Sequence, residues 1–432
     1  MSILIGLLII CIAIFPKINI ISVGTGSAGI RIEDFLIAII CMIFFGFSKY
    51  KKNENNKNYV LKKLNEYFLI YFTFSLISTM YGIYKSYVTP LIGFLFLFRK
   101  LEYYLVFFAG YYYGKIKPDT NRKFMNLIVF FHFIMCLLQL LGLVGSFNRG
   151  EMLSTLTQGR VSSTFNGAYE LSAFLLIILP YYINSLLKDK KYKISNILNI
   201  IFITFCIIES MSRTSLIIEI IIFFLMIFKS GVLQNKKNVQ KLIISVVFLI
   251  LPLFVFTLPK FDFSRFSNLN INKTIYIIKY TWKNKNFNRY IKTGSWYGNS
   301  IYSLNQIDSM GYDGSLYQRL SHWMQLLDGW KSSPLIGVGV SVSGNSADGN
   351  YVKILVETGI LGLVTWIMLL KYILILLKKK ENWLIYSYFT ILLGAVFIDL
   401  FDSSKVIMTF WLLLGIYLRR IFENDKKCCN CE

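Results

Sequence analysis

The chain has 432 residues, of which 55% are hydrophobic and only 16% are charged. About a quarter of the residues of soluble proteins are charged, so this composition excludes an ordinary soluble domain, and it also excludes a disordered chain or a disulfide-rich secreted module. The formal charge of +23 at pH 7 would fit a nucleic-acid-binding protein, but most Lys and Arg stand in short runs between long apolar segments. That placement indicates a polytopic membrane protein.

Twelve apolar segments are long enough to be considered as transmembrane helices, which need roughly 20 mostly apolar residues. They lie near residues 2–21, 32–48, 64–84, 91–113, 124–144, 168–187, 195–211, 214–230, 241–258, 351–377, 382–400 and 405–420. Pro16 and Lys17 interrupt the first segment, and Pro180 is expected to kink the sixth. The tenth is long enough to tilt or to leave the membrane. The first segment has no basic start and no small-residue cleavage site, so we expect it to be retained.

The basic residues alternate between successive loops, and this alternation orients the chain. The even-numbered loops and the C-terminal tail carry 25 Lys and Arg, whereas the short odd-numbered loops carry seven, which are Lys17, Arg31, Lys85, Arg149, Arg160, Arg213 and Lys405. Basic residues are enriched in cytoplasmic loops. We therefore expect both termini and the even loops in the cytoplasm and the odd loops on the outer face.

Two of the expected outer loops are longer than ordinary connections, one near residues 145–167 and one near 259–349. The second is rich in aromatic residues: Trp282, Tyr290, Trp296, Tyr297, Tyr302, Tyr312, Trp323 and Trp330. These fit two interpretations equally, an interfacial belt on amphipathic helices or a platform for sugar faces. The expected organisation is nine transmembrane helices in 1–258, a large extracytoplasmic loop in 259–349, three transmembrane helices in 350–420 and a cytoplasmic tail in 421–432. The expected fold class is all-α, with about twelve transmembrane helices.

Motifs for cofactors and metals are absent from the sequence, which has no glycine-rich phosphate loop, no HExxH and no paired CxxC. Cys428, Cys429 and Cys431 crowd the tail, but three thiolates without a nearby histidine are a poor zinc set, so we expect a reduced, non-catalytic tail. His132 fits a hydrogen-bonded bundle histidine better than a ligand. We expect neither a metal nor a cofactor, so any phosphate chemistry depends on Arg and Lys.

Charged residues on the expected outer face are the candidates for chemistry. Arg213 stands between the seventh and eighth spans, and Glu209 lies four residues earlier, at the spacing of a helical ion pair. Arg160 precedes the sixth span, and Arg319 and Asp348 lie near the end of the large loop. Taken singly, these residues could be snorkelling or loop charges, part of a surface helix, or a helix N-cap. Together, guanidinium groups suit phosphate and a carboxylate can act as a general base, so the set fits transfer of a group from a diphosphate-linked carrier.

Three segments make the sequence recognisable. They are RVSSTFNGAYELSAFLLIILP, SMSRTSL and QRLSHWMQLLDGWKSSPLIGVGV followed by DGNYVKILVETGILGL. With the expected layout of spans and one large outer loop, the chain resembles the O-antigen ligase/polymerase superfamily, which includes Wzy-type polysaccharide polymerases and WaaL-type ligases. The resemblance implies a GT-C-type glycosyltransferase of the bacterial inner membrane whose active site lies on the outer face.

The resemblance also implies roles for individual residues. Arg213 and Arg319 match family arginines that hold the donor diphosphate, and Asp348 is the candidate base. The residues expected to bind substrate are Arg160, Glu209, His322, Trp323 and Tyr351. Ligases of this family carry a His followed by Asn, Ser or Gln nine residues before a Gly-x-x-Gly, whereas Asp348 and Gly349 stand there in this chain. This difference favours a polymerase over a ligase.

The resemblance implies that the partners are undecaprenyl-diphosphate-linked oligosaccharides, as donor and as acceptor, together with membrane lipid and a chain-length regulator protein, and no nucleic acid. The reaction is expected to be inverting and independent of metal. Two alternatives stay open. One is a ligase that moves the glycan to a lipid or protein, and the other is a transporter or flippase, which the charges Arg99, Lys100 and Glu102 inside the fourth span would fit.

Overall fold

The structure is a computed structural model of the chain. It describes residues 2–17, 19–23, 28–31, 34–35, 37, 39, 58–113, 118–148, 151–156, 159–188, 193–229, 271–283, 285–288, 291, 314–343, 348–378 and 383–429. The expected span at 241–258 and almost all of the one at 32–48 lie outside these residues, as do the expected loop residues Arg149, Tyr290 and Trp296.

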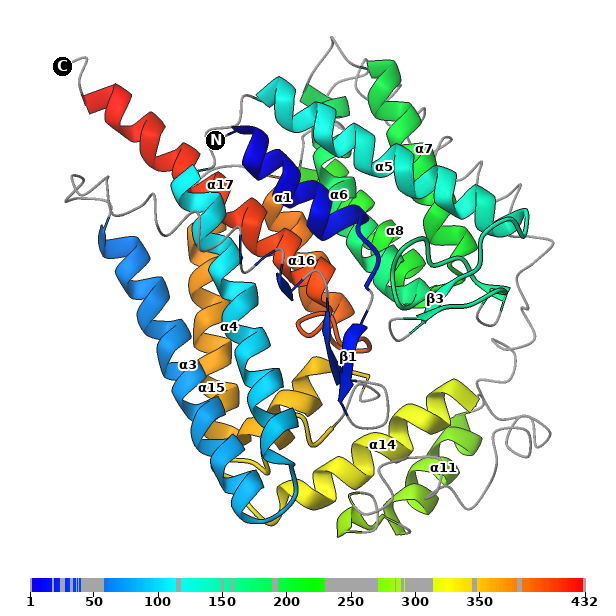
Figure 1. Cartoon of the computed structure of the whole chain (residues 1–432), viewed down its shortest axis with the longest axis vertical. Helices are drawn as coiled ribbons and strands as arrows, with labels where there is room; N and C mark the ends of the chain where they lie inside the picture. The colour runs from blue at the N-terminus through cyan, green and yellow to red at the C-terminus, as the bar shows by residue number, and fades with distance from the viewer. Residues whose placement is uncertain are drawn as a thin grey trace. The chain divides into compact units, whose positions relative to one another are not determined.

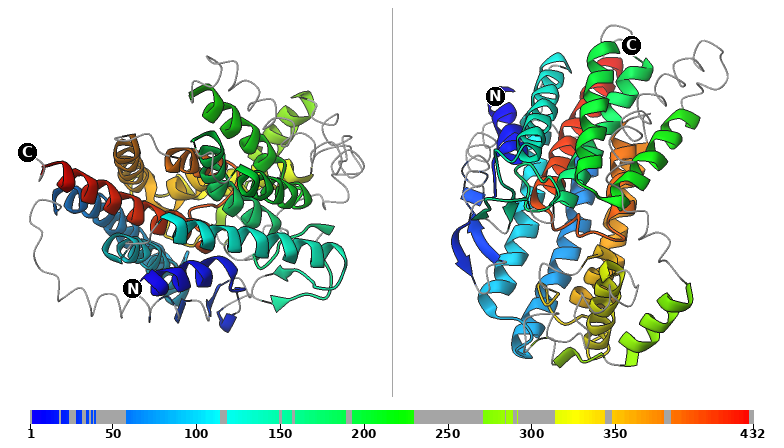
Figure 2. Two further views of the ribbon diagram at one scale, coloured as in Figure 1. Left: turned by 90° about the horizontal axis from the view of Figure 1, so that it is seen from above. Right: turned by 90° about the vertical axis from the view of Figure 1, so that its right-hand side faces the viewer.

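The chain forms two compact units, and helices dominate both of them. The first unit contains Met1–Tyr59, Leu101–Lys260 and Ile373–Glu432, and the second contains Val60–Lys100 and Phe261–Tyr372. Figures 1 and 2 trace the elements by colour, from α1 in blue to α17 in red. The large loop expected at 259–349 thus shares a unit with parts of three apolar helices.

The first unit is organised around α6 (Ala168–Lys188), whose residues 171–180 are all buried. A helix that is apolar on every side is stable only when other helices surround it. Here α6 packs against α7 (Lys193–Glu209), α8 (Arg213–Lys229), α16 (Leu384–Gly394) and α17 (Ser404–Cys429). On another side of the unit, α5 (Pro118–Leu140) contacts α7 and α1 (Ser2–Ile14).

Two short antiparallel hairpins supplement the helices of the first unit. In one, β1 (Asn19–Val23) pairs with β2 (Ala28–Arg31), and in the other, β3 (Phe147–Asn148) pairs with β4 (Glu151–Met152). The fold is therefore helical, as predicted, except for these two hairpins, which hydropathy does not reveal because each strand is too short to give a periodic signal.

The second unit contains α3 (Asn58–Tyr84), the first part of α4 (Pro90–Tyr113), α11 (Ile271–Lys283), α14 (Gly314–Trp330) and most of α15 (Asn350–Lys378). α3 and α4 lie side by side and join through a tight turn (Figures 1 and 2). A small core forms where α14 meets the start of α15, built from Phe287, Leu326, Val338 and Val356. Tyr87, in the α3–α4 turn, packs against this core.

Four described helices are long and apolar enough to cross a membrane. They are Val60–Tyr84, Arg122–Leu140, Ala168–Leu187 and Asn350–Lys378, which correspond to the third, fifth, sixth and tenth expected spans. Helices also form at four further expected spans, as α4, α7, α8 and α17. The full number of twelve and the assignment of segments to sides of the membrane stay predictions.

Two expected spans form shorter helices than predicted. The segment at 2–21 is helical only as far as Ile14, because Pro16 lacks an N–H group and the chain then turns into the β1–β2 hairpin. The segment at 382–400 is helical only over Leu384–Gly394. The last carbonyls of this helix accept hydrogen bonds from the N–H groups of the turn residues 395–398. A helix of 13 residues is about 20 Å long, short of the roughly 30 Å of a bilayer core.

The tenth expected span is not one straight helix, because α15 breaks at Gly359, where φ is 69° and ψ is −171°. The rings of Tyr351 and Trp366 lie 5.4 Å apart across the break. In a straight helix, fifteen residues would separate them by about 22 Å. The excess length of this segment is therefore accommodated by a sharp kink rather than by a uniform tilt, and Asn350–Thr358 forms a short helix of its own direction.

Candidate active site

The segment 159–167, part of which was singled out in the sequence, is a loop whose residues 161–165 are buried inside the first unit. The side chain of Gln139, in α5, holds this loop through four hydrogen bonds. Its Oε1 accepts from the N–H groups of Ser162 and Ser163, at 3.0 and 2.8 Å. Its Nε2 donates to the backbone carbonyls of Gly145 and Ser163. His132 Nδ1 lies 2.8 Å from Ser163 Oγ. Because buried backbone groups must find partners, these polar side chains allow an irregular loop to lie among apolar helices.

This loop also meets the junction of α7 and α8. The Val161 N–H donates to the Glu209 carbonyl at 3.3 Å, which places Arg160 next to the end of α7. Glu209 is the last residue of α7 and Arg213 the first of α8, so the two do not share a helix as the expected i,i+4 pairing requires. The cause is the turn between them, in which Met211 has a φ of +50°. Ser212 stands at the N-cap of α8, and its carbonyl accepts from the Leu216 N–H at 3.1 Å.

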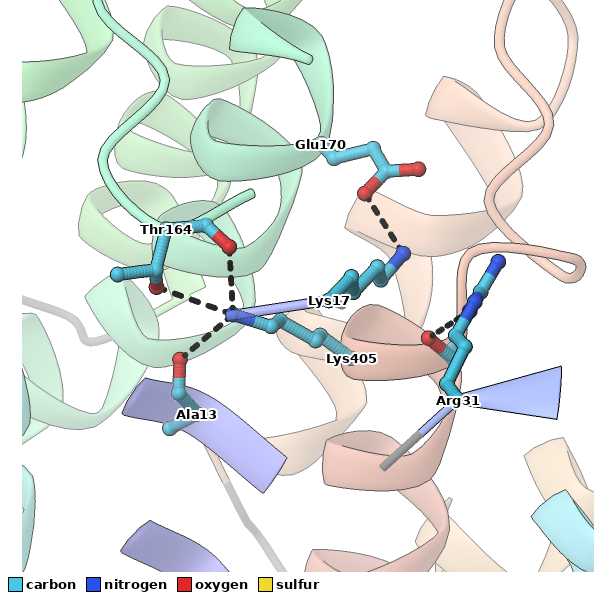
Figure 3. A network of polar contacts seen from close by, with 7 residues as sticks. Ala13, Lys17, Arg31, Thr164, Glu170 and Lys405 are labelled. Atoms are coloured by element: carbon cyan, nitrogen blue, oxygen red, sulfur yellow. Dashed lines mark hydrogen bonds and ion pairs between the residues drawn. The ribbon is translucent and has the colours of Figure 1, made fainter. Parts of the chain in front are cut away.

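A buried lysine ties this loop to two helix ends. Lys405, at the start of α17, is 1% exposed, and its ammonium donates to the Ala13 carbonyl at 3.3 Å and to the Thr164 carbonyl and hydroxyl at 2.9 and 3.0 Å (Figure 3). It also lies 4.3 Å from the centroid of the Phe165 ring. A buried ammonium is costly unless such acceptors surround it, so these contacts hold the loop, α1 and α17 in one arrangement.

Two further cations of the expected outer loops lie near Lys405 (Figure 3). Lys17 is 2% exposed and pairs with Glu170 in the first turn of α6, at 2.9 Å. Arg31 is 9% exposed and donates to Ser404 Oγ at 3.3 Å. From the sequence, Lys17 and Arg31 were expected only as loop charges, and Glu170 was not among the candidate residues. Two features of the sequence could have identified these residues. Cations are rare in the odd-numbered loops, and Glu170 is a carboxylate at the start of an otherwise apolar helix.

In the second unit, the structure brings Arg319 of α14 to Asp348, just before α15. Arg319 Nε donates to Asp348 Oδ2 at 2.8 Å, and the two side chains are 30% and 36% exposed. This leaves both Nη groups of the guanidinium for other acceptors. Asp348 is not the helix cap, because Gly349 supplies the carbonyl that accepts the first helical hydrogen bond, from the Lys353 N–H. An accessible Arg–Asp pair is therefore present where the sequence predicted a phosphate ligand and a base.

Trp323 of α14 contacts this pair, and the neighbouring His322 is buried. The Trp323 indole N–H donates to the backbone carbonyl of Asp348, which fixes the position of the carboxylate. His322 is only 2% exposed. Burial, with a smaller effect from nearby Lys353, lowers the pKa of His322 to about 4. A neutral, buried imidazole fits packing behind the pair better than direct contact with substrate.

The turn at 334–343, which contains Pro-Leu-x-Gly-x-Gly, pairs with the break in α15. The Val338 and Gly339 N–H groups donate to the carbonyls of Val356 and Glu357, and the Ile360 and Leu361 N–H groups donate to the carbonyls of Pro334 and Leu335. Gly337 and Gly359 have φ values of +79° and +69°, and a Cβ at either would collide with the carbonyl across the pairing. The two glycine motifs are thus one structural feature, in which the turn and the break in α15 satisfy each other's backbone groups.

Glu357 anchors the same turn from within α15. It is 2% exposed, and its Oε1 accepts from the Ser341 N–H at 3.1 Å and from the Ser343 hydroxyl. Tyr351, predicted to bind substrate, is the second residue of the same helix segment and is half-buried. Its role stays a prediction.

The predicted site residues thus fall into two groups. Arg160, Glu209 and Arg213 come together in the first unit, and Arg319, Asp348, Trp323 and His322 come together in the second. Among the described residues, no three His, Cys, Asp or Glu side chains are grouped so that they could hold a metal ion.

Residues 198–367 match the family model described as O-antigen ligase, a range that includes Glu209, Arg213, Arg319 and Asp348. No curated protein matches the chain. Together with the candidate spans, the match indicates an integral membrane protein. Over this range, which is less than half of the chain, the protein is similar to the O-antigen ligase family, and this similarity supports the resemblance to the O-antigen ligase/polymerase superfamily.

Proposed function

We propose that this protein is a polysaccharide polymerase that joins repeat units carried on undecaprenyl diphosphate at the outer face of the bacterial inner membrane. The observation that carries the proposal is the accessible Arg319–Asp348 pair inside the matched O-antigen ligase domain. A cation suited to phosphate and a carboxylate suited to accept a proton lie 2.8 Å apart. Glycosyl transfer from a diphosphate needs both.

In the proposed reaction, a hydroxyl of the acceptor sugar attacks the anomeric carbon of the donor. The new glycosidic C–O bond forms as the bond between that carbon and the diphosphate oxygen breaks, so undecaprenyl diphosphate leaves with the electron pair. Asp348 accepts the proton of the attacking hydroxyl. The Nη groups of Arg319 stabilise the charge that develops on the leaving diphosphate, an effect that is large where water is scarce. Attack from the side opposite the leaving group inverts the anomeric configuration.

Arg213 is the second diphosphate ligand in this proposal. It stands at the first position of α8, where the helix dipole also favours an anion. Ser212 and Ser215, whose hydroxyls are 2.8 Å apart, and Ser172, 2.7 Å from Ser215, hold the start of α8 against α6. These bonds limit the movement of Arg213, which reduces the entropy lost when it binds a ligand.

A ligase is the second candidate, and the description of the matched family as O-antigen ligase favours it. The chemistry at the donor would be the same, and only the acceptor would differ. The product distinguishes the two: a polymerase extends chains in steps of one repeat unit, whereas a ligase moves a finished chain to a different acceptor.

Two of the three charges that suggested a transporter, Arg99 and Lys100, contact aromatic rings. Lys100 Nζ donates to Tyr71 Oη at 2.9 Å and lies 5.2 Å from the centroid of that ring, which joins α4 to α3. The Arg99 guanidinium lies 5.3 Å from the centroid of the Phe96 ring. These contacts support a structural role for the two cations.

The test is complementation of a polymerase-deficient strain that carries the matching glycan locus, followed by in vitro assay with the lipid-linked repeat unit. Wild-type protein should produce a ladder with one-repeat increments. Arg319→Lys and Arg213→Lys should each reduce chain extension by roughly a hundredfold or more, because lysine lacks the planar fork of donors. Asp348→Asn keeps the Trp323 bond, which goes to the backbone, and should lose transfer while the protein still folds.

Arg420→Lys on α17 is the matched control, and it should extend chains normally. Normal ladders from Arg319→Lys would contradict the proposed binding of diphosphate by Arg319. Normal ladders from Asp348→Asn would contradict the proposed role of Asp348 as the general base. A single product without a ladder, formed only when a separate acceptor is added, would identify a ligase instead.

A further inference from the structure

One face of α11 is exposed and apolar, a feature that the proposed reaction does not use. Ile275, Ile278 and Trp282 are 45%, 36% and 48% exposed. Their spacing of three and four residues puts them on one side of the helix. Tyr276, 55% exposed, lies beside them and stacks on Tyr280 at 6.2 Å between ring centroids. A contiguous apolar face of this kind marks a surface that binds something other than water.

Lysines border this face. Lys279 and Lys283 are exposed on α11 itself. Lys285 Nζ lies 3.2 Å from the centroid of the Trp282 ring, and Lys331 Nζ, from the turn after α14, lies 5.1 Å from it. The edge of the apolar face is thus basic, as in helices that lie on membrane surfaces.

Lys285 and Lys331 are close enough to affect each other. The pKa of Lys285 is lowered, first by partial desolvation of its ammonium group and then by the neighbouring Lys331 ammonium. Asp328 offsets part of this repulsion, since its carboxylate lies 3.8 Å from Lys331 Nζ. Two ammonium groups held beside one aromatic ring repel each other, and an anion between them relieves the repulsion. A phosphate group has the charge and the oxygen atoms to accept from both.

The packing of this region places it at the end of a candidate membrane span. Phe287, four residues after α11, lies 5.3 Å from the ring of Tyr87, just beyond the end of α3 at Tyr84. At that same end, Lys85 Nζ lies 5.4 Å from the centroid of the Tyr84 ring and 6.0 Å from that of Tyr81. Tyrosine and lysine at the end of an apolar helix are typical of the membrane–water boundary.

We propose that α11 lies along the membrane surface, with Ile275, Ile278 and Trp282 among the acyl chains, and that Lys285 and Lys331 bind the phosphate groups of anionic lipids. The two isoleucines favour lipid over glycan, because sugar hydroxyls placed against aliphatic side chains lose hydrogen bonds to water without replacing them. Of the two interpretations of the aromatic loop, this favours the interfacial belt for α11. The proposal does not depend on the glycosyl-transfer reaction.

The experiment places a benzophenone-bearing amino acid at position 278 and reconstitutes the full chain in nanodiscs of phosphatidylglycerol diluted in phosphatidylcholine. Irradiation should crosslink both lipids, with phosphatidylglycerol captured in excess of its share. The double variant Lys285→Gln/Lys331→Gln should still capture lipid but should lose this excess, a change of roughly tenfold in relative capture. The double variant Lys193→Gln/Lys229→Gln, which removes two exposed lysines from the first unit, should keep the excess.

The same photoreactive group at Tyr317, which is 4% exposed, controls for non-specific labelling and should capture no lipid. Absence of lipid capture from position 278 would overturn the membrane placement of α11. Capture without excess of phosphatidylglycerol, or an excess that the Lys285/Lys331 variant retains, would overturn the phosphate site. Loss of lipid capture on addition of an oligogalacturonate would assign the surface to an acidic glycan and would overturn the proposal.

Discussion

Arg319 and Asp348 lie 29 positions apart in the chain, and their contact makes them a candidate catalytic pair. About a third of each side chain in the pair is exposed, whereas His322 and Glu357 in the same unit are each 2% exposed. Surface ion pairs contribute little to stability, typically 0 to about 1 kcal/mol. The pair is therefore better explained by function than by stability, and the buried residues behind it carry the structural role.

His322 gives a prediction about pH. Its folded pKa of about 4 lies below the unfolded value of about 6.5. Between these values the unfolded chain binds a proton that the folded chain does not, so the free energy of unfolding should decrease as pH falls, by up to about 3 kcal/mol in total. Above pH 6.5 and below pH 4 this residue should have no further effect. Melting temperatures in detergent from pH 7.5 to 4.5 should fall less steeply for His322→Gln than for wild type; equal slopes would contradict the burial of His322.

For individual residues, the sequence predicted which charged residues are candidates for the site and on which side of the membrane they are expected. It did not predict which residues contact each other. It identified Arg319, Asp348 and Arg213 from their positions in expected outer loops. It did not predict that Arg319 contacts Asp348, or that Lys405 inserts between α1 and the buried loop, because both contacts join residues far apart in the chain. Such contacts depend on how several helices pack, which no local pattern specifies.

The break in α15 is the element that hydropathy describes least well. An apolar run reports that a segment can enter a membrane, but it carries no information on φ and ψ. Gly359 adopts a conformation that essentially only glycine tolerates, and the turn at 334–343 fills the hydrogen-bonding gap that results. The sequence did show the glycine motifs, and the structure shows why they occur together.

Gly359→Ala should therefore destabilise the protein by at least about 2 kcal/mol, from backbone strain and from the collision of Cβ with the Leu335 carbonyl. Gly142→Ala is the matched control, because Gly142 also has a positive φ, of +70°, but has no atom within 4 Å of the added Cβ. It should cost only about 1 kcal/mol. Thermal melting of the two variants compares them directly. Equal losses would show that the pairing of α15 with the turn contributes nothing.

For the whole molecule, composition was sufficient to predict a membrane protein, and the apolar runs located most of the helices. Helix ends were less predictable, as the early termination at Ile14 and Gly394 shows, because turns and prolines act at single residues. The matched domain at 198–367 includes Arg213 from the first unit and Arg319 from the second. The account requires both guanidinium groups to bind one diphosphate.

A double-mutant cycle on Arg213→Lys and Arg319→Lys tests this requirement most directly. The measurement is the initial rate of transfer at low donor concentration for wild type, both single variants and the double variant. If the two arginines bind the same diphosphate, their effects are not additive, and the coupling should exceed about 1 kcal/mol. Effects that add to within about 0.5 kcal/mol would mean that the arginines act independently, and they would contradict the account.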